Sequence, residues 1–272
     1  MQMKINHMKE RHTIVLCIVI SIAFVVVIAL TKWISFNTPN QYLVKLVREL
    51  LCAVFSVFIA LMFKGKELFR EKRCGFFQGL SVAAFPITLS SLVIISGVLN
   101  AQATLLPISN VVVFVVFVVF VGIAEEFFFR GCIANILADK YLKSEKGLYI
   151  TVFISGCIFG AMHLINLFSG VEISGVIIQA ICTIPIGCLF TAIYLRTKNI
   201  WLLVFIHGLN DFAGLINSGL YGVDTVENTI SGYSYLQLIS IFIYLVPIFF
   251  LLRKSKAREI IFWACQSDTS GH

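Results

Sequence analysis

Apolar stretches long enough to cross a bilayer recur along this chain, and short polar segments separate them. A helix rises 1.5 Å per residue, so about 17–25 mainly apolar residues cross the hydrocarbon core. The pattern predicts an all-α fold, a polytopic membrane bundle of about eight transmembrane helices. The predicted helices lie near 13–31, 44–63, 79–99, 108–128, 148–168, 174–195, 200–217 and 235–252.

The second stretch, 44–63, is the least regular of these, because Lys45, Arg48 and Glu49 lie in its first turns. A charged side chain at the centre of a bilayer costs roughly 2.5–3.5 kcal/mol on insertion scales. The segment therefore has two interpretations. It either crosses the membrane in full or begins as a helix that lies on the membrane surface.

The composition agrees with a membrane protein. Of the 272 residues, 59% are hydrophobic and 13% are charged, whereas soluble domains usually carry about 25% charged residues. No low-complexity tract or linker rich in proline and glycine interrupts the chain, so we expect one transmembrane domain over residues 1–272. The eight cysteines form no C-x-x-C pair, and neither a disulfide framework nor a thiolate metal site is expected.

The net charge of +7 is distributed unevenly. Lysine and arginine concentrate in the two tails and in alternate connections between apolar stretches, near 64–73, 130–146 and 196–198. The positive-inside rule then predicts a multi-pass protein of the cell membrane with both termini in the cytoplasm. The basic residues are explained as a topology signal, so the expected partner is the lipid bilayer, and no nucleic-acid partner is expected.

Few ionisable residues lie inside the later apolar stretches, and they occur in three places. Because charge is costly in a membrane, such residues mark functional sites by default. They are Glu125, Glu126 and Arg130 in the fourth stretch, His163 in the fifth, and His207 and Asp211 in the seventh.

Their spacing predicts specific contacts. Glu126 and Arg130 are four residues apart and should form an ion pair, which leaves Glu125 without a cation in its own helix. Glu125 and His163 are equally far from the turn near residue 144, so an antiparallel hairpin holds them at one height. His207 and Asp211 share a helix face, with Asn210 also within reach.

Three chemistries are compatible with these groups. A hydrolase would use Glu125 to activate water and an imidazole to position it. A zinc enzyme would use His163, His207 and Glu125 as ligands, although the chain lacks an H-E-x-x-H motif. A proton-coupled transporter would use the same groups as a relay, but the two halves of the chain show no inverted repeat.

Three motifs resemble those of a known family. "EEFFFR" (125–130), "FGAMH" (159–163) and "HGLND" (207–211) are similar to the EExxxR, FxxxH and HxxxN/D motifs of the CPBP intramembrane proteases. This family is named for CAAX-prenyl proteases and bacteriocin-processing enzymes, and is also called the Abi family. The resemblance covers about residues 110–215, the expected catalytic motif region.

The resemblance implies an intramembrane endopeptidase that acts on membrane-associated peptides or lipidated proteins. It implies no cofactor, with a zinc metalloprotease as the alternative type of enzyme. A non-catalytic protein of the same fold, serving bacteriocin self-immunity or membrane scaffolding, is the alternative function. The implied roles are Glu125 as general base, His163 holding the attacking water, His207 with Asp211 facing the oxyanion, and Glu126, Arg130, Asn210 and Phe159 in support.

One position differs from the usual pattern of the family. Members often have Asn where this chain has Asp211. An amide can donate a hydrogen bond to an oxyanion, whereas a carboxyl group donates only when it is protonated. Three alternatives follow: Asp211 acts as a neutral acid, or it orients His207, or Asn210 donates the hydrogen bond instead.

Overall fold

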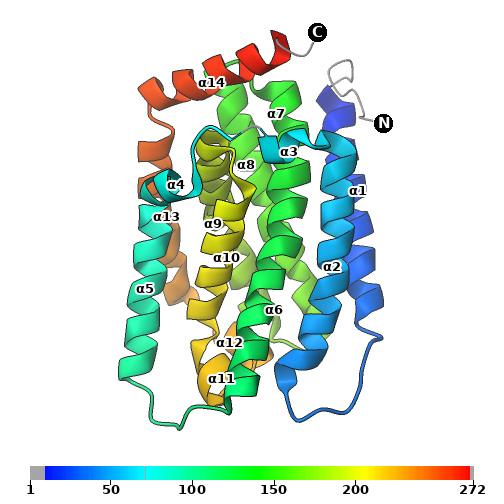
Figure 1. Cartoon of the computed structure of the whole chain (residues 1–272), viewed down its shortest axis with the longest axis vertical. Helices are drawn as coiled ribbons and strands as arrows, with labels where there is room; N and C mark the ends of the chain where they lie inside the picture. The colour runs from blue at the N-terminus through cyan, green and yellow to red at the C-terminus, as the bar shows by residue number, and fades with distance from the viewer. Residues whose placement is uncertain (1–9, 71, 270–272) are drawn as a thin grey trace.

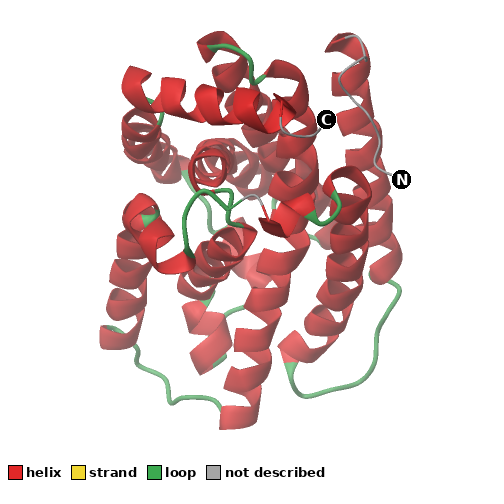
Figure 2. Cartoon of the chain, turned by 45° about the horizontal axis from the view of Figure 1, so that its top comes forward, coloured by secondary structure: helices red, strands yellow, loops and turns green. Residues whose placement is uncertain are grey.

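The computed structural model describes residues 10–70 and 72–269, and in these residues all regular structure is helical (Figures 1 and 2). The predicted all-α class is confirmed. Long helices run side by side in alternating directions, and one helix lies across the end of the bundle where the first helix begins (Figure 1). The helices that run along the bundle are α1 (Glu10–Thr31), α2 (Gln41–Lys64), α5 (Ala84–Leu99), α6 (Ile108–Glu126), α8 (Glu145–Met162), α9 (Ile173–Thr197), α10 (Ile200–Gly214) and α13 (Ile239–Leu251).

Shorter elements connect these helices or cap the two ends. They are α3 (Glu67–Arg70), α4 (Phe76–Val82), α7 (Asn135–Tyr141), α11 (Ile216–Tyr221), α12 (Val226–Ser231) and α14 (Lys254–Thr269), with a π-helical segment η1 (Phe127–Ala134) and two 3₁₀ segments, η2 (His163–Ser169) and η3 (Tyr235–Leu238). Helix α14 is the one that lies across the end of the bundle (Figure 1).

The helices have the length and composition of a multi-pass membrane protein. Among the described residues, five helices are long and apolar enough to cross a bilayer, or up to seven if each of two bent helix pairs counts as one span. Helix α10 is apolar but has only 15 residues, about 22 Å of helix. The long helices follow the predicted stretches in order, and the lower count arises because several of them are short or bent.

The first helix shows how apolar side chains are distributed. Its outer face exposes Val15, Val19, Ile22 and Leu30, a continuous apolar surface that suits lipid and would be unfavourable in water. Its other face buries Phe24, whose ring stacks on Phe128 with centroids 4.2 Å apart. Helix α1 is therefore a peripheral helix with one side available to lipid.

The charged start of α2 is part of the bundle. The helix begins at Gln41 and is continuous to Lys64, so the surface-lying alternative is not adopted. Lys45 forms a 2.7 Å ion pair with Glu227. The guanidinium of Arg48 donates hydrogen bonds to the backbone carbonyls of Ile34, at 2.7 Å, and Lys32, at 3.2 Å. Two of the three charged side chains, Lys45 and Arg48, thus have partners in the segments that connect the long helices.

Helix α6 continues through η1 into α7, and together they form 34 residues of helix from Ile108 to Tyr141. Such a helix is about 51 Å long, which exceeds the roughly 30 Å of a hydrocarbon core. A continuous helix of this length extends beyond the hydrocarbon core. The π-helical segment was not predicted; such segments are rare and frequently lie at functional sites.

Glycines bring α8 and α9 into close contact. A Cβ atom on Gly160 would lie 2.6 Å from the carbonyl oxygen of Ala180, and one on Gly156 would lie 2.9 Å from that of Ile184. Small residues allow this approach between helices in a membrane. Gly156 and Gly160 thus form a G-x-x-x-G motif whose partner is α9.

Candidate active site

A buried ion pair lies at the centre of the site. Arg130 donates from Nη1 to Oε1 of Glu126 at 2.7 Å, and both side chains are 0% exposed. Nη2 of Arg130 donates to the carbonyl of Gly187 on α9 at 3.1 Å. The guanidinium also lies 4.7 Å from the ring centroid of Phe159 and 5.3 Å from that of Phe190. The predicted ion pair is present, and it joins α6 and η1 to α8 and α9.

His207 connects this pair to the other carboxyl groups. Its Nδ1 lies 2.5 Å from Oε1 of Glu126. A carboxylate only accepts, so Nδ1 carries the proton of this hydrogen bond. Nε2 then faces Oε2 of Glu125 at 3.6 Å and Oδ2 of Asp211 at 3.5 Å. One imidazole on α10 therefore contacts all three predicted carboxyl groups.

Glu125 differs from Glu126 in its access to water. Its side chain is 26% exposed, whereas that of Glu126 is fully buried. The Oε2 atom of Glu125 is itself buried and has no hydrogen-bond partner in the described part of the chain. Oε2 of Glu126 also lacks a partner, but Oε1 of that residue accepts from both Arg130 and His207. Glu125 is therefore the carboxyl group that remains available for a small polar molecule.

His163 is held by its own helix. Its Nδ1 lies 3.0 Å from the carbonyl oxygen of Phe159, and because a carbonyl only accepts, Nδ1 is the donor. In the neutral ring Nε2 is then an acceptor. The ring of Phe159 packs edge-on between the two histidines, with centroids 5.1 Å from His163 and 6.0 Å from His207.

A small cavity of about 160 Å³ adjoins Glu125 and His163. It has room for a few water molecules. Phe24 and Ile28 of α1 form part of its wall, so a peripheral helix separates it from lipid on that side. The full set of lining residues is Phe24, Ile28, Glu49, Glu125, Phe129, Met162, His163, Ile165 and Asn166.

Glu49 is the member of this set that sequence reasoning missed. It was considered only as one of three charges that made the second stretch irregular. It lies eight residues into α2, about 12 Å along the helix, and it faces the same cavity as Glu125. The sequence signal for Glu49 is an acidic residue inside an apolar stretch. The neighbouring cations Lys45 and Arg48 make this part of the stretch resemble a helix on the membrane surface.

Asp211 and Asn210 lie at the edge of the site. The carboxyl of Asp211 is 23% exposed, and the side chain of Asn210 interacts with it. The structure thus brings Glu125, Glu126, Arg130, His207 and Asp211 into one contact network. His163 reaches this group through the cavity that it shares with Glu125.

The donors do not form a metal-binding group. Among the side chains described, those of residues 11–70 and 72–266, no three His, Cys, Asp or Glu side chains are arranged to hold one metal ion. This includes the alternative zinc set of His163, His207 and Glu125. We therefore derive no reaction step through a metal.

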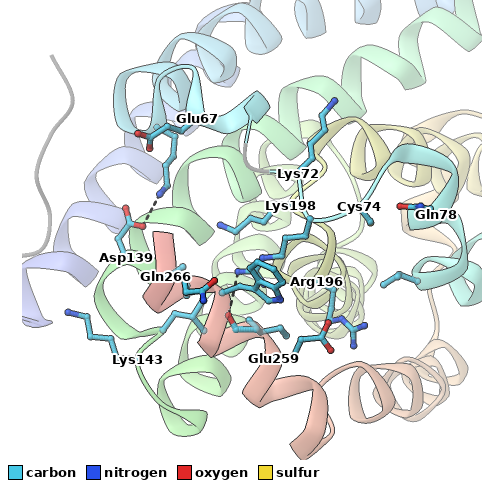
Figure 3. A pocket seen from close by; sticks show the side chains of 18 residues that line it. Glu67, Lys72, Cys74, Gln78, Asp139, Lys143, Arg196, Lys198, Glu259 and Gln266 are labelled. Carbon is cyan, nitrogen blue, oxygen red and sulfur yellow. Dashed lines mark hydrogen bonds and ion pairs between the residues drawn. The ribbon is translucent and has the colours of Figure 1, made fainter. Parts of the chain in front are cut away.

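A second and larger cavity, of about 870 Å³, lies under α14 (Figure 3). Acidic and basic side chains line it together, and Lys64 and Asp139 form an ion pair of 3.0 Å there. Glu259 and Arg196 also lie on its wall (Figure 3). It shares no lining residue with the small cavity, so it is a separate feature of the molecule.

Comparison with known proteins agrees with the motifs. Residues 107–213 match the model of the family described as type II CAAX prenyl endopeptidase, Rce1-like. The match covers less than half of the 272 residues, but it includes every predicted site residue from Glu125 to Asp211. It does not include Glu49. No curated protein and no solved structure matches this chain.

Proposed function

We propose that the chain is an intramembrane endopeptidase in which Glu125 activates water, on the premise that residues 107–213 match the family model of Rce1-like type II CAAX prenyl endopeptidases. Its substrates would be membrane-associated peptides or prenylated proteins. The family supports a membrane peptidase, and the catalytic type and substrate class are our proposal.

The proposal depends mainly on one observation, the environment of Glu125. This carboxyl has a buried oxygen without a hydrogen-bond partner among the described residues, and it faces a cavity that can hold water. A general base must lie within hydrogen-bonding reach of the proton that it removes. A water molecule between Glu125 and Nε2 of His163 would satisfy this condition, because both atoms accept hydrogen bonds.

The reaction then follows from these positions. Glu125 removes a proton from the water, and the hydroxide forms a bond to the carbonyl carbon of the substrate. The carbonyl oxygen gains negative charge. A donor placed where this charge develops lowers the barrier, and removing one such donor typically costs about 10²–10³-fold in rate. His207 can fill this role from Nε2 when its ring is an imidazolium, because Nδ1 already donates its proton to Glu126 and only the protonated ring carries a second proton on Nε2.

The remaining groups hold these residues in place. The imidazolium form that His207 needs as a donor is stabilised by the carboxylates of Glu126, Glu125 and Asp211 around its ring. Arg130 fixes Glu126, and Phe159 separates the two histidines. Supporting contacts of this kind determine whether catalytic groups keep a productive geometry.

The position of the cavity favours a substrate that lies in the membrane. Its wall includes side chains of the peripheral helix α1, whose outer face is apolar and exposed. A chain that is already anchored in lipid would pass beside α1, which lies between the cavity and lipid on that side. The cytoplasmic location of both termini stays a prediction.

The test compares the wild-type protein with Glu125→Gln on a library of membrane-tethered peptides, half of them farnesylated at a C-terminal cysteine. Glutamine keeps the size of the side chain but cannot accept a proton from water. We expect cleavage by the wild-type protein to fall by roughly 10²–10⁴-fold in the variant. Glu227→Gln on α12, at a residue that does not line the cavity, is the control and should cleave like the wild type.

Each assay is repeated with a chelator. Cleavage that survives the chelator and disappears in Glu125→Gln supports the glutamic mechanism. Cleavage that the chelator abolishes would replace it with a metalloprotease. If the wild-type protein and Glu125→Gln both leave the whole library intact, the proposal is wrong, and the chain is a non-catalytic immunity or scaffold protein of this fold.

A further inference from the structure

Among the three charged residues at the start of α2, Glu49 is the one for which the described structure shows no ion pair or hydrogen bond. Lys45 and Arg48 are neighbours that could neutralise it, but Lys45 pairs with Glu227 and Arg48 binds backbone carbonyls. The carboxyl of Glu49 forms no hydrogen bond or ion pair with the side chains and backbone described for residues 11–70 and 72–266. An unpaired acid inside an apolar helix is costly, so a purely structural role is disfavoured.

The carboxyl of Glu49 belongs to the catalytic cavity. It lines the same 160 Å³ as Glu125 and His163, and it interacts electrostatically with Glu125, Asp211 and His207. Most of the other lining side chains are apolar. Two carboxylates that face one small apolar cavity repel each other, and they are most stable when they hold one proton between them.

The surroundings assign that proton to Glu49. Glu125 lies 3.6 Å from the His207 imidazole, which stabilises a negative charge on Glu125. Glu49 interacts with His207 only at longer range, because no ion pair joins these two side chains in the described part of the structure. Pairs of carboxyl groups in different environments are how active sites separate an acid from a base.

The proposed hydrolysis needs such an acid. When the carbon–nitrogen bond breaks, the electron pair goes to the nitrogen, and an amine leaves only if this nitrogen gains a proton. Glu125 has by then taken the proton of the attacking water. A second acid that lines the same cavity could supply the second proton without waiting for the first to move.

We propose that Glu49 is a further catalytic residue, the general acid that protonates the leaving amine. The inference depends on the proposed peptidase function. The proton on Glu49 moves to the substrate nitrogen as the carbon–nitrogen bond breaks, and Glu49 becomes a carboxylate. The proton that Glu125 took from water then returns to Glu49 through water in the cavity, which restores both groups.

Two matched substrates test this role. The first is the library peptide that the wild-type protein cleaves fastest, and the second is the same peptide with its scissile amide replaced by a thioester. A thiol has a pKa of about 8.5, so a thiolate leaves without being protonated. We expect Glu49→Gln to slow amide cleavage on the order of 10²–10⁴-fold and to leave thioester cleavage at nearly the wild-type rate.

Two further variants calibrate the comparison. Glu125→Gln should lose both activities, because both substrates need an activated water. Glu145→Gln changes an exposed acid at the start of α8, whose partner is Arg258, and should keep both activities. If the wild-type protein cleaves no peptide, the peptidase proposal fails, and this result is distinct from a failure of the Glu49 role.

The ratio of the two rates decides the outcome. If Glu49→Gln slows both substrates equally, or slows neither, Glu49 is not the proton donor. If this variant is not recovered in folded form, Glu49→Asp provides the same ratio, since it keeps the acid on a shorter side chain. A lower ratio of amide to thioester cleavage in Glu49→Asp than in wild type supports the role, and an unchanged ratio contradicts it.

Discussion

The two cavities of this molecule differ in a way that locates the chemistry. The cavity under α14 is more than five times larger than the one beside Glu125 (Figure 3), and its charges of both signs lie close together. The small cavity is lined mainly by apolar side chains, and the two carboxyl groups that line it, Glu49 and Glu125, interact electrostatically. Carboxyl groups without a neutralising partner, more than the volume of a cavity, distinguish a candidate catalytic site.

The ion pairs near the two cavities also differ in how far their side chains are exposed to solvent. The side chains of Arg130 and Glu126 are both 0% exposed, whereas those of Lys64 and Asp139 are 13% and 34% exposed. Solvent screens the second pair, so it should contribute about 0–1 kcal/mol. Breaking the first pair leaves a buried charge without its partner, which typically costs about 3–5 kcal/mol.

The largest effect should come from Arg130→Met. We expect the free energy of unfolding in detergent to fall by about 3–5 kcal/mol, because Glu126 is left buried without its cation. Cleavage should be lost with it, since Glu126 positions His207. The double variant Glu126→Gln with Arg130→Met should be destabilised by less than the sum of the two single variants. Additive losses would show that the two side chains do not act as a pair.

The next effect concerns the contact between α8 and α9. Gly160→Ala places a Cβ atom 2.6 Å from the carbonyl oxygen of Ala180, so the helices must separate. We expect a loss of about 1–3 kcal/mol in unfolding free energy and slower cleavage, because His163 follows Gly160 on the same helix. Gly214→Ala is the matched control, since a Cβ atom there meets nothing within 4 Å. Equal effects at both glycines would contradict the role of close packing.

A smaller effect is expected for Asp211→Asn. The carboxyl of Asp211 lies 3.5 Å from Nε2 of His207, and an amide of the same size can also orient the ring or donate a hydrogen bond. The variant should keep substantial cleavage activity in the membrane-tethered peptide assay. An inactive Asp211→Asn protein with normal stability would show that the carboxylate itself is required, as it would be for a metal ligand.

The smallest effect should follow a change in the large cavity. Asp139→Asn removes the acid that pairs with Lys64. We expect the unfolding free energy to change by less than about 1 kcal/mol, and the cleavage rate to stay at the wild-type value. A loss of cleavage in this variant would mean that the large cavity takes part in the reaction, and the contrast between the cavities would no longer hold.

Local spacing predicted the contacts that lie within one helix or across one turn. Glu126 and Arg130 pair because four residues bring them to one helix face, and Glu125 shares a cavity with His163 because the hairpin near residue 144 holds them at one height. The hydrogen bond from His207 to Glu126 was not predicted. It joins residues 81 positions apart, and no spacing rule reaches across that distance.

The sequence by itself determined that this protein is helical, apolar and equipped with three motifs, because hydropathy and short spacings are local properties. Only the tertiary structure decided how these parts meet. Three features depend on how separate helices pack. They are the π-helical turn after Glu126, the position of His207 between three carboxyl groups, and the placement of Glu49 on the cavity that Glu125 also lines. Packing angles and rotations arise from contacts among many side chains, and a linear pattern does not encode them one residue at a time.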